Sequence, residues 1–204
     1  MAKIKKKKTK EEELEKKIQE LLITVGLRIA KRGEGALFVV GEVEYKPLMD
    51  QQVPSFNALK NPKLLESLAL MDGGVILNKE GIVTAYGVMV KSKKAFKNFG
   101  TRHSAGLSAS KGDNLVVIVS EEDRKLRILK NGKMIMQIDA LQKNVEQSVP
   151  QAVNLLESLG AGTVGAIGTG LLVPGLGIAL VPGIVVFGSA YYLAKILGGW
   201  VRKR

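Results

Sequence analysis

The chain has 204 residues, of which 46% are hydrophobic, enough to bury a core. It contains no cysteine, which excludes disulfides, cysteine-bound zinc and thiol catalysis. The formal net charge is +12, but six lysines within residues 1–10 and the final Arg202, Lys203 and Arg204 supply nine of these charges. Because the basic residues gather at two ends, they predict a solvated arm or contact with an anionic membrane. We expect no specific nucleic-acid partner.

Residues 1–32 combine this lysine-rich arm with an amphipathic helix. Thr9 and Glu12 have the spacing of a capping box, which predicts that the helix begins there. The apolar part is too short and too interrupted by charge for a signal peptide. Apolar residues recur at helical spacing and should pack on a neighbour as one stripe: Leu14, Ile18, Leu21, Leu22, Val25 and Ile29.

Residues 33–140 have the pattern of one α/β (α+β) domain. Short apolar runs broken by turn signals alternate with a helical stretch, which predicts a mixed central β-sheet covered by helices. Asn131 and Gly132 form a hairpin-turn pair between two of the runs. The expected elements are a strand in 35–42, a helix in 61–71, two strands in 74–90 and two or three strands in 114–138.

Residues 141–204 are expected to contain a linker helix and then a Gly-rich apolar segment. No charged residue occurs in 158–194, a run of 37 residues. One membrane-crossing helix needs about 20 apolar residues, so one span fits and two full spans with a turn do not quite fit. Three arrangements stay open: a single span, a re-entrant helical hairpin turning near 173–177, and a hairpin packed in a soluble core or oligomer.

The basic residues on both sides of this segment favour the hairpin, because it keeps both of them on the cytosolic side of a membrane. We therefore expect a C-terminal apolar helical hairpin that contacts the membrane through residues 160–195. The expected location is the cytoplasmic face of the cell membrane, with the cytoplasm as the alternative.

Three short polar stretches of the middle domain have groups suited to chemistry. Asp72 precedes two glycines at the start of an expected strand, and the run 100–104 offers a hydroxyl, a guanidinium and an imidazole. The run 119–123 ends another strand with one hydroxyl and three acids. Guanidinium and backbone N–H groups bind phosphate, and carboxylates bind divalent cations. Each stretch alone is typical of an ordinary turn or solvated strand end, but together they favour a polyphosphate site.

The same stretches carry a resemblance to one known family. The chain resembles the diadenylate cyclase domain, as in the N-terminal domain of DisA, over about half of its length. The resemblance implies a nucleotidyltransferase that condenses two ATP into cyclic di-AMP and two pyrophosphates across a face-to-face homodimer. It also implies one Mg²⁺ or Mn²⁺ ion for each ATP. The matching stretches are GAL at 35–37, DGG at 72–74, GTRHSA at 100–105 and VSEE at 119–122.

The resemblance also implies roles for individual residues. Asp72 would help to bind the metal and activate the attacking 3′-hydroxyl, while Arg102 and His103 would hold the reacting phosphates. Glu122, or else Glu121, would complete the metal site. The residues implied in nucleotide binding are Gly73, Gly74, Val88, Met89, Thr101, Arg102, His103, Ser104 and Ser120.

Two positions depart from the family pattern. Gly74 replaces the motif alanine, and Ser104 replaces the second arginine of Arg-His-Arg. A lost charge-assisted contact costs about 1.5–3 kcal/mol, which would weaken an enzyme of this kind. The alternative hypothesis is therefore a catalytically weak or silent, membrane-tethered module that senses ATP or cyclic di-AMP. A third reading is salt-dependent nucleic-acid binding through the lysine arm.

Overall fold

The computed structural model describes residues 2–51, 53–92, 101–160 and 183–186. Within them, nine strands form one mixed sheet: β1 Ala36–Val40, β2 Tyr45–Pro47, β3 Phe56–Asn57, β4 Gly74–Leu77, β5 Ile82–Val90, β6 Leu115–Val119, β7 Lys125–Lys130, β8 Lys133–Asp139 and β9 Ile184–Val186. Their order is β2-β5-β4-β1-β6-β7-β8-β9, with β3 paired to β5. Among these strands, β1 and β4 pair in parallel and the other pairs are antiparallel.

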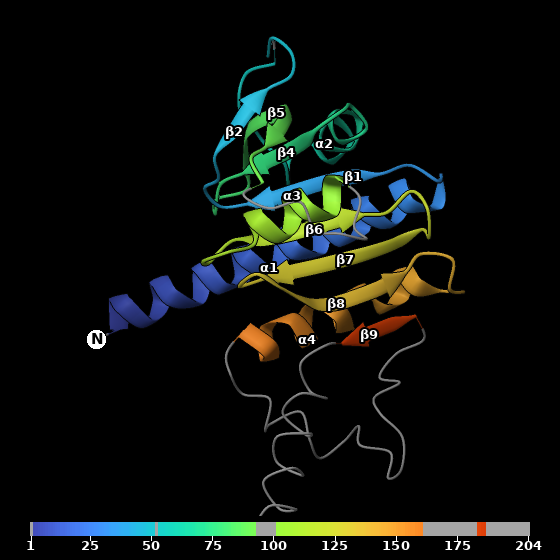
Figure 1. The fold of residues 1–204 in the computed structure, drawn as a ribbon. Coiled ribbons are helices and arrows are strands. Elements are labelled where there is room, and N and C mark those ends of the chain that lie inside the picture. Colours follow the sequence, from blue (N-terminus) through green and yellow to red (C-terminus); the bar gives the residue numbers. More distant parts are fainter. Residues whose placement is uncertain (1, 52, 93–100, 161–182, 187–204) are drawn as a thin grey trace, which may run out of the picture.

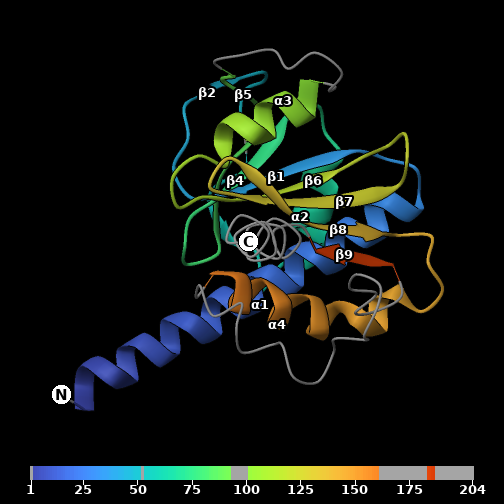
Figure 2. The same cartoon turned by 60° about the horizontal axis from the view of Figure 1, so that its bottom comes forward.

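Helices cover both faces of this sheet (Figures 1 and 2). The helices are α1 Ala2–Lys31, α2 Pro62–Ala69, α3 Thr101–Ala109 and α4 Val149–Gly160, with a 3₁₀ turn, η1, at Val145–Ser148. Buried residues of α1, α2 and α4 share one apolar cluster with one face of the strands. Residues of α3 join a second cluster on the opposite face. The predicted fold class, a mixed sheet covered by helices, is confirmed.

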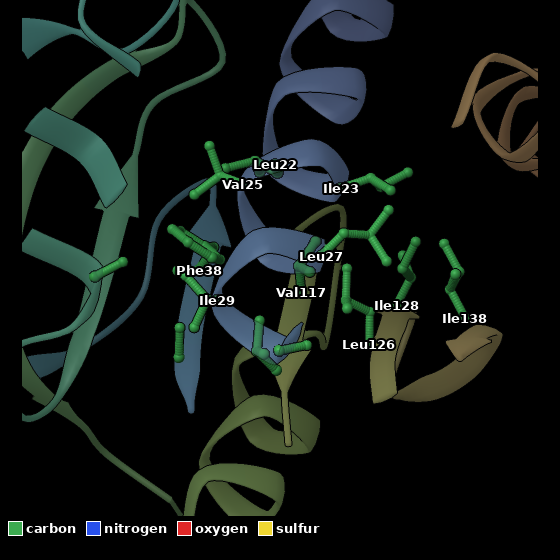
Figure 3. Close-up of a cluster of buried hydrophobic side chains, with 14 of the residues drawn as sticks. Leu22, Ile23, Val25, Leu27, Ile29, Phe38, Val117, Leu126, Ile128 and Ile138 are labelled. Carbon is green, nitrogen blue, oxygen red and sulfur yellow. The ribbon is translucent and has the colours of Figure 1, made fainter. Parts of the chain in front are cut away.

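The main core lies between α1 and the sheet (Figure 3). Leu22, Val25 and Ile29 of the predicted stripe are fully buried and face strands that carry Phe38 and Val117. The burial of α1 is wider than one stripe, because the helix is also covered by α4. These residues on its other sides are buried too: Ile23, Leu27 and Ala30.

α4 runs antiparallel to α1. An ion pair of 2.9 Å joins Lys16 Nζ to Glu157 Oε2, and a second ion pair joins Lys31 to Glu146. The C-terminal end of α4 therefore lies beside the N-terminal half of α1. The first turns of α1 extend away from the rest of the fold from that same side (Figures 1 and 2).

The predicted capping box at Thr9 is wrong, because α1 begins at Ala2 and Thr9 lies inside the helix. Lysine and glutamate are good helix formers, so no local signal ends the helix at this point. The packed half of α1 supplies the nucleus from which helix extends along the arm.

The C-terminal region differs from the prediction at one place. Ile184–Val186 form β9, which pairs with β8 at the edge of the sheet, so the predicted hairpin is wrong at these residues. β-Branched residues suit a strand, and Asp139 N donates to Gly183 O at 2.8 Å to start the pairing. The predicted linker helix is present as α4, and the rest of the predicted hairpin lies outside the described residues. No helix within the described ranges has the length and apolar character needed to cross a bilayer.

The predicted strands and the helix of the middle domain are confirmed. β1, β4, β5, β6 and β7 fall within the expected runs, and β8 ends one residue beyond its run. The short strands β2 and β3 were not predicted. α2 begins with Pro62 at its first position. Asn131 and Gly132 have φ values of 54° and 69°, the left-handed pair that a tight hairpin between β7 and β8 requires.

The packing of α1 can be tested with Leu27→Ala. Leu27 is 1% exposed, so we expect the free energy of unfolding to fall by about 2–5 kcal/mol in urea titrations. The control is Leu141→Ala, at a leucine that is 63% exposed, where a change within about 0.5 kcal/mol is expected. Equal effects of the two substitutions would contradict the burial of α1 against the sheet.

Candidate functional site

The predicted site residues meet at one edge of the sheet, which here means the side formed by the ends of the central strands β4, β1 and β6. β1 and β4 run parallel and begin at this edge, whereas β6 is antiparallel to β1 and ends there. Ala36 at the start of β1 pairs with Val119 at the end of β6. Asp72 and the two glycines after it therefore lie beside Gly35 on the β4 side. Ser120 and the acids that follow it lie beside Gly35 on the β6 side.

α3 brings the Thr-Arg-His run to the same edge (Figure 1). The sequence analysis missed this helix, because its glycine, serines and alanines gave no helical signal. The small residues allow close packing instead. A Cβ added at Gly106 would lie 2.6 Å from Ile118 Cδ1, so glycine lets α3 rest directly on β6. Thr101, Arg102 and His103 form the first turn of the helix.

Arg102 lies between Gly35 and Glu121. A Cβ at Gly35 would overlap Arg102 Nη1 and lie 3.0 Å from Cζ, so the guanidinium rests against the bare backbone of Gly35. Nη1 donates to Glu121 Oε2 at 3.4 Å, and the two side chains are 36% and 62% exposed. Such an exposed ion pair contributes little energy, so it does not lock Arg102 in place.

Asp123 and Arg127, which the sequence analysis did not assign to the site, form a partly buried ion pair beside it. Both terminal nitrogens of Arg127 donate hydrogen bonds to the Asp123 carboxylate, and the Ser120 side chain also hydrogen-bonds to this carboxylate. Burial opposes ionisation of Asp123. The hydrogen bonds from Arg127 and Ser120 outweigh it and hold the pKa of the carboxyl below its ordinary value. This network fixes the turn between β6 and β7 that carries Glu121 and Glu122. Its only sequence signal was Asp123 four residues before Arg127.

His103 is half-buried beside this network. Burial lowers the pKa of its imidazole below 6.5, and the positive charge of Arg127 lowers that pKa further. Asp123 and Glu122 act in the opposite direction but do not reverse the shift. The neutral imidazole is therefore the main form at pH 7.

Asp72 is exposed, and its Oδ1 accepts a hydrogen bond of 2.9 Å from Gly73 N. Gly73 has φ +96°, and a Cβ there would lie 2.7 Å from the backbone N of Val88. Only glycine fits this position. At Gly74, a Cβ would lie 3.3 Å from Leu37 Cδ2, so the alanine of the family pattern would need only a small shift of the leucine side chain.

The remaining predicted contact residues differ in exposure. Met89 is 52% exposed, whereas Val88, directly across from Gly74, is 1% exposed. Ser104 is 7% exposed, and its carbonyl accepts a hydrogen bond of 3.3 Å from the Ser92 hydroxyl. The hydroxyl of Ser120, which is 6% exposed, is directed to Asp123. The fold thus brings Thr101, Arg102, His103 and Met89 toward solvent but keeps the two serines inside.

The predicted metal ligands are exposed carboxylates at this edge. Asp72 precedes β4 and Glu122 follows β6, so their backbones are two strand spacings apart, about 10 Å. Within the described part of the chain, no three His, Cys, Asp or Glu side chains come close enough to hold a metal ion by themselves. Mg²⁺ commonly takes one or two carboxylates together with substrate phosphates, and the separated Asp72, Glu121 and Glu122 fit that arrangement.

A polar groove of about 600 Å³ lies at the opposite edge of the sheet. Its lining includes Lys79, Asp113 and Asn114 but none of the predicted site residues. Lys79 pairs with Asp113 at 2.7 Å, and Asn114 Nδ2 donates to Glu42 O at 2.8 Å. These groups pair with one another, and the groove lies apart from the candidate site.

Comparisons with known proteins identify one family. A sequence model of the family described as DAC, DisA bacterial checkpoint controller nucleotide-binding, matches residues 26–134. A diadenylate cyclase of Haloferax volcanii is 31% identical over 135 residues, which cover 56% of this chain and 50% of that protein.

Two further relatives come from Bacillus species. The diadenylate cyclase CdaS of Bacillus thuringiensis is 34% identical over 112 residues, covering 51% of this chain and 56% of CdaS. The cyclic di-AMP synthase CdaA of Bacillus subtilis is 31% identical over 149 residues, covering 66% of this chain and 53% of CdaA. The chain thus spans about half the length of these relatives.

The environment of His103 predicts an NMR titration below the ordinary histidine pKa of 6.5. His103 is the only histidine, so its ring protons report one titration. Arg127→Met removes a charge that lowers this pKa and should raise it, while Lys79→Met at the opposite edge should leave it unchanged. A wild-type pKa at or above 6.5 would contradict the half-buried position.

The same shift has a consequence for stability. The unfolded chain binds more protons than the folded chain between the folded pKa of His103 and about 6.5. The stability contributed by the neutral imidazole is therefore complete above this window and is lost as the pH falls through it. His103→Gln should flatten this part of the pH dependence in urea titrations.

Proposed function

The chain belongs to the diadenylate cyclase family, and we propose that it condenses two ATP into cyclic di-AMP with release of two pyrophosphates. The observation that carries the proposal is the meeting of Asp72, Arg102 and Glu121 at one edge of the sheet. These residues come from three stretches that are far apart in the chain, and together they offer both phosphate donors and exposed carboxylates.

In this proposal the first turn of α3 holds the triphosphate. Arg102 supplies the positive charge, and its guanidinium matches the geometry of phosphate oxygens. Thr101 is exposed and supplies a hydroxyl. His103 is neutral at pH 7, so it contributes a hydrogen bond to phosphate rather than a second fixed charge.

Asp72 is proposed to act on the attacking 3′-hydroxyl. Its carboxylate is exposed, and Oδ1 accepts a hydrogen bond from the backbone N–H of its own neighbour Gly73, which leaves acceptor capacity for an incoming hydroxyl. With Glu122, or else Glu121, it would hold a Mg²⁺ or Mn²⁺ ion, which neutralises phosphate charge when bound.

Ring closure requires two ATP molecules that react with each other. The exposed positions of Asp72, Thr101 and Met89 place one nucleotide site at the surface of one chain. We therefore propose that a second copy of the chain faces this edge and presents the other ATP. Each 3′-hydroxyl would then attack the α-phosphate held by the opposite copy.

A cyclase assay tests this proposal. Wild-type protein with ATP and Mn²⁺ should form cyclic di-AMP and pyrophosphate, and Asp72→Asn should lower the rate at least about a hundredfold. The matched control is Asp113→Asn, which removes an exposed carboxylate at the opposite edge and should retain activity. Absence of product from wild-type protein at dimer-forming concentrations would contradict the proposal.

The silent nucleotide-binding module remains the second candidate because of Ser104. It predicts saturable ATP binding without release of pyrophosphate. Ser104 is buried where α3 meets the sheet. Although the arginine of the family pattern is missing at this position, Arg102 and His103 still reach the surface. The remaining donors favour a weakened cyclase over a silent module.

We also propose that the protein contacts an anionic membrane surface. The lysine arm extends from the same side on which α4 ends at Gly160 (Figures 1 and 2). The six lysines of the arm can therefore meet anionic lipid headgroups on that side of the fold.

Vesicle sedimentation tests this contact. Replacing the six lysines of residues 1–10 by glutamine should lower binding to phosphatidylglycerol vesicles at least about tenfold. The control removes the same charge from exposed lysines elsewhere: Lys46, Lys60, Lys63, Lys79, Lys91 and Lys111. Equal losses in both variants, or tighter binding to duplex DNA than to vesicles, would contradict a membrane role for the arm.

A further inference from the structure

Gly35 is the residue at this edge for which the sequence analysis gave no role. It precedes the first residue of β1, and its φ lies outside the left-handed region that favours glycine. The φ angle at this position therefore does not by itself require glycine. A Cβ here would overlap Arg102 Nη1 and lie 3.0 Å from Cζ, so a side chain at position 35 would force the guanidinium to move.

The guanidinium of Arg102 has neighbours on two sides. The bare backbone of Gly35 lies under it, and Glu121 accepts a hydrogen bond from Nη1 at 3.4 Å. The side chain is still 36% exposed, so part of the guanidinium faces solvent. A guanidinium has five N–H donors, which leaves several for an anion after the bond to Glu121.

We propose that Gly35 is a positioning residue. Because it has no side chain, the guanidinium of Arg102 can lie against the backbone at the start of β1, with its remaining N–H donors directed to the triphosphate. A methyl group at position 35 would push the guanidinium off the edge of β1 and away from the turn that carries Glu121. The inference rests on the proposed function only in taking a polyphosphate as the anion.

The test is a double-mutant cycle on the full chain, with binding of inorganic tripolyphosphate and of ATP measured by calorimetry in the presence of Mg²⁺. Gly35→Ala should weaken both about ten- to a hundredfold, the value of a lost charge-assisted contact. In the Arg102→Ala background the same substitution should cause no further loss, because the group it displaces is gone. Additive effects, or unchanged binding by Gly35→Ala, would overturn the proposal, as would a wild-type protein that binds neither anion.

Gly112→Ala is the matched control. It adds the same methyl group at the opposite edge, where nothing lies within 4 Å, and its φ of +75° makes it at least as costly to the backbone. Unchanged anion binding in this variant separates the loss of Arg102 placement from a general loss of stability.

Folding gives a second readout. If Gly35→Ala alone does not fold, Gly35→Ala with Arg102→Ala should fold like Arg102→Ala, and failure of both would show that the backbone itself requires glycine. Product formation is read separately. A wild-type protein that binds tripolyphosphate but makes no cyclic di-AMP contradicts the proposed function and leaves the role of Gly35 intact.

Discussion

The pairing of β1 is the constraint on which the candidate site depends. β1 is parallel to β4 on one side and antiparallel to β6 on the other, so two strand starts and one strand end meet at one edge. The register of β1 is fixed from both faces, because Phe38 lies in the core under α1 while Leu37 and Val39 lie in the core under α3. A slip of one residue would exchange these faces and separate the three polar stretches.

The two helix layers hold this sheet in different ways. α1 contributes large side chains such as Leu22 and Leu27, which fill a deep core and give the sheet its stability. α3 contributes small residues, and Gly106 lets it lie close to Ile118. Arg102 lies one turn before Gly106 in the same helix, close to the point where α3 rests on the sheet.

Local patterns were sufficient for β1, for β4 to β8 and for α2, where apolar runs, Pro62 and Asn131-Gly132 give signals within a few residues, but not for the short strands β2 and β3. They were insufficient wherever a distant contact decides the outcome. The sequence of α3 has no amphipathic pattern, and its helix is stabilised by packing on β6. β9 forms because the outer side of β8 is open for pairing. The polar stretches around Asp72 and Arg102 were recognised from residue type, but the contact of Gly35 with Arg102 spans 67 residues and leaves no local signature.

The charges at the edge explain why acids and a phosphate site occur together. Arg127 is paired with Asp123, and the neutral form of His103 is the main one at pH 7, so Arg102, which pairs only weakly with Glu121, is the positive charge that the described site offers to a nucleotide. One guanidinium does not balance a triphosphate, and the exposed Asp72, Glu121 and Glu122 add repulsion. The same carboxylates become favourable once a divalent cation lies between them and the phosphates. Under the proposed function, the excess of acids at this edge is thus a reason to expect cation-dependent binding of ATP, with metal-free nucleotide bound more weakly.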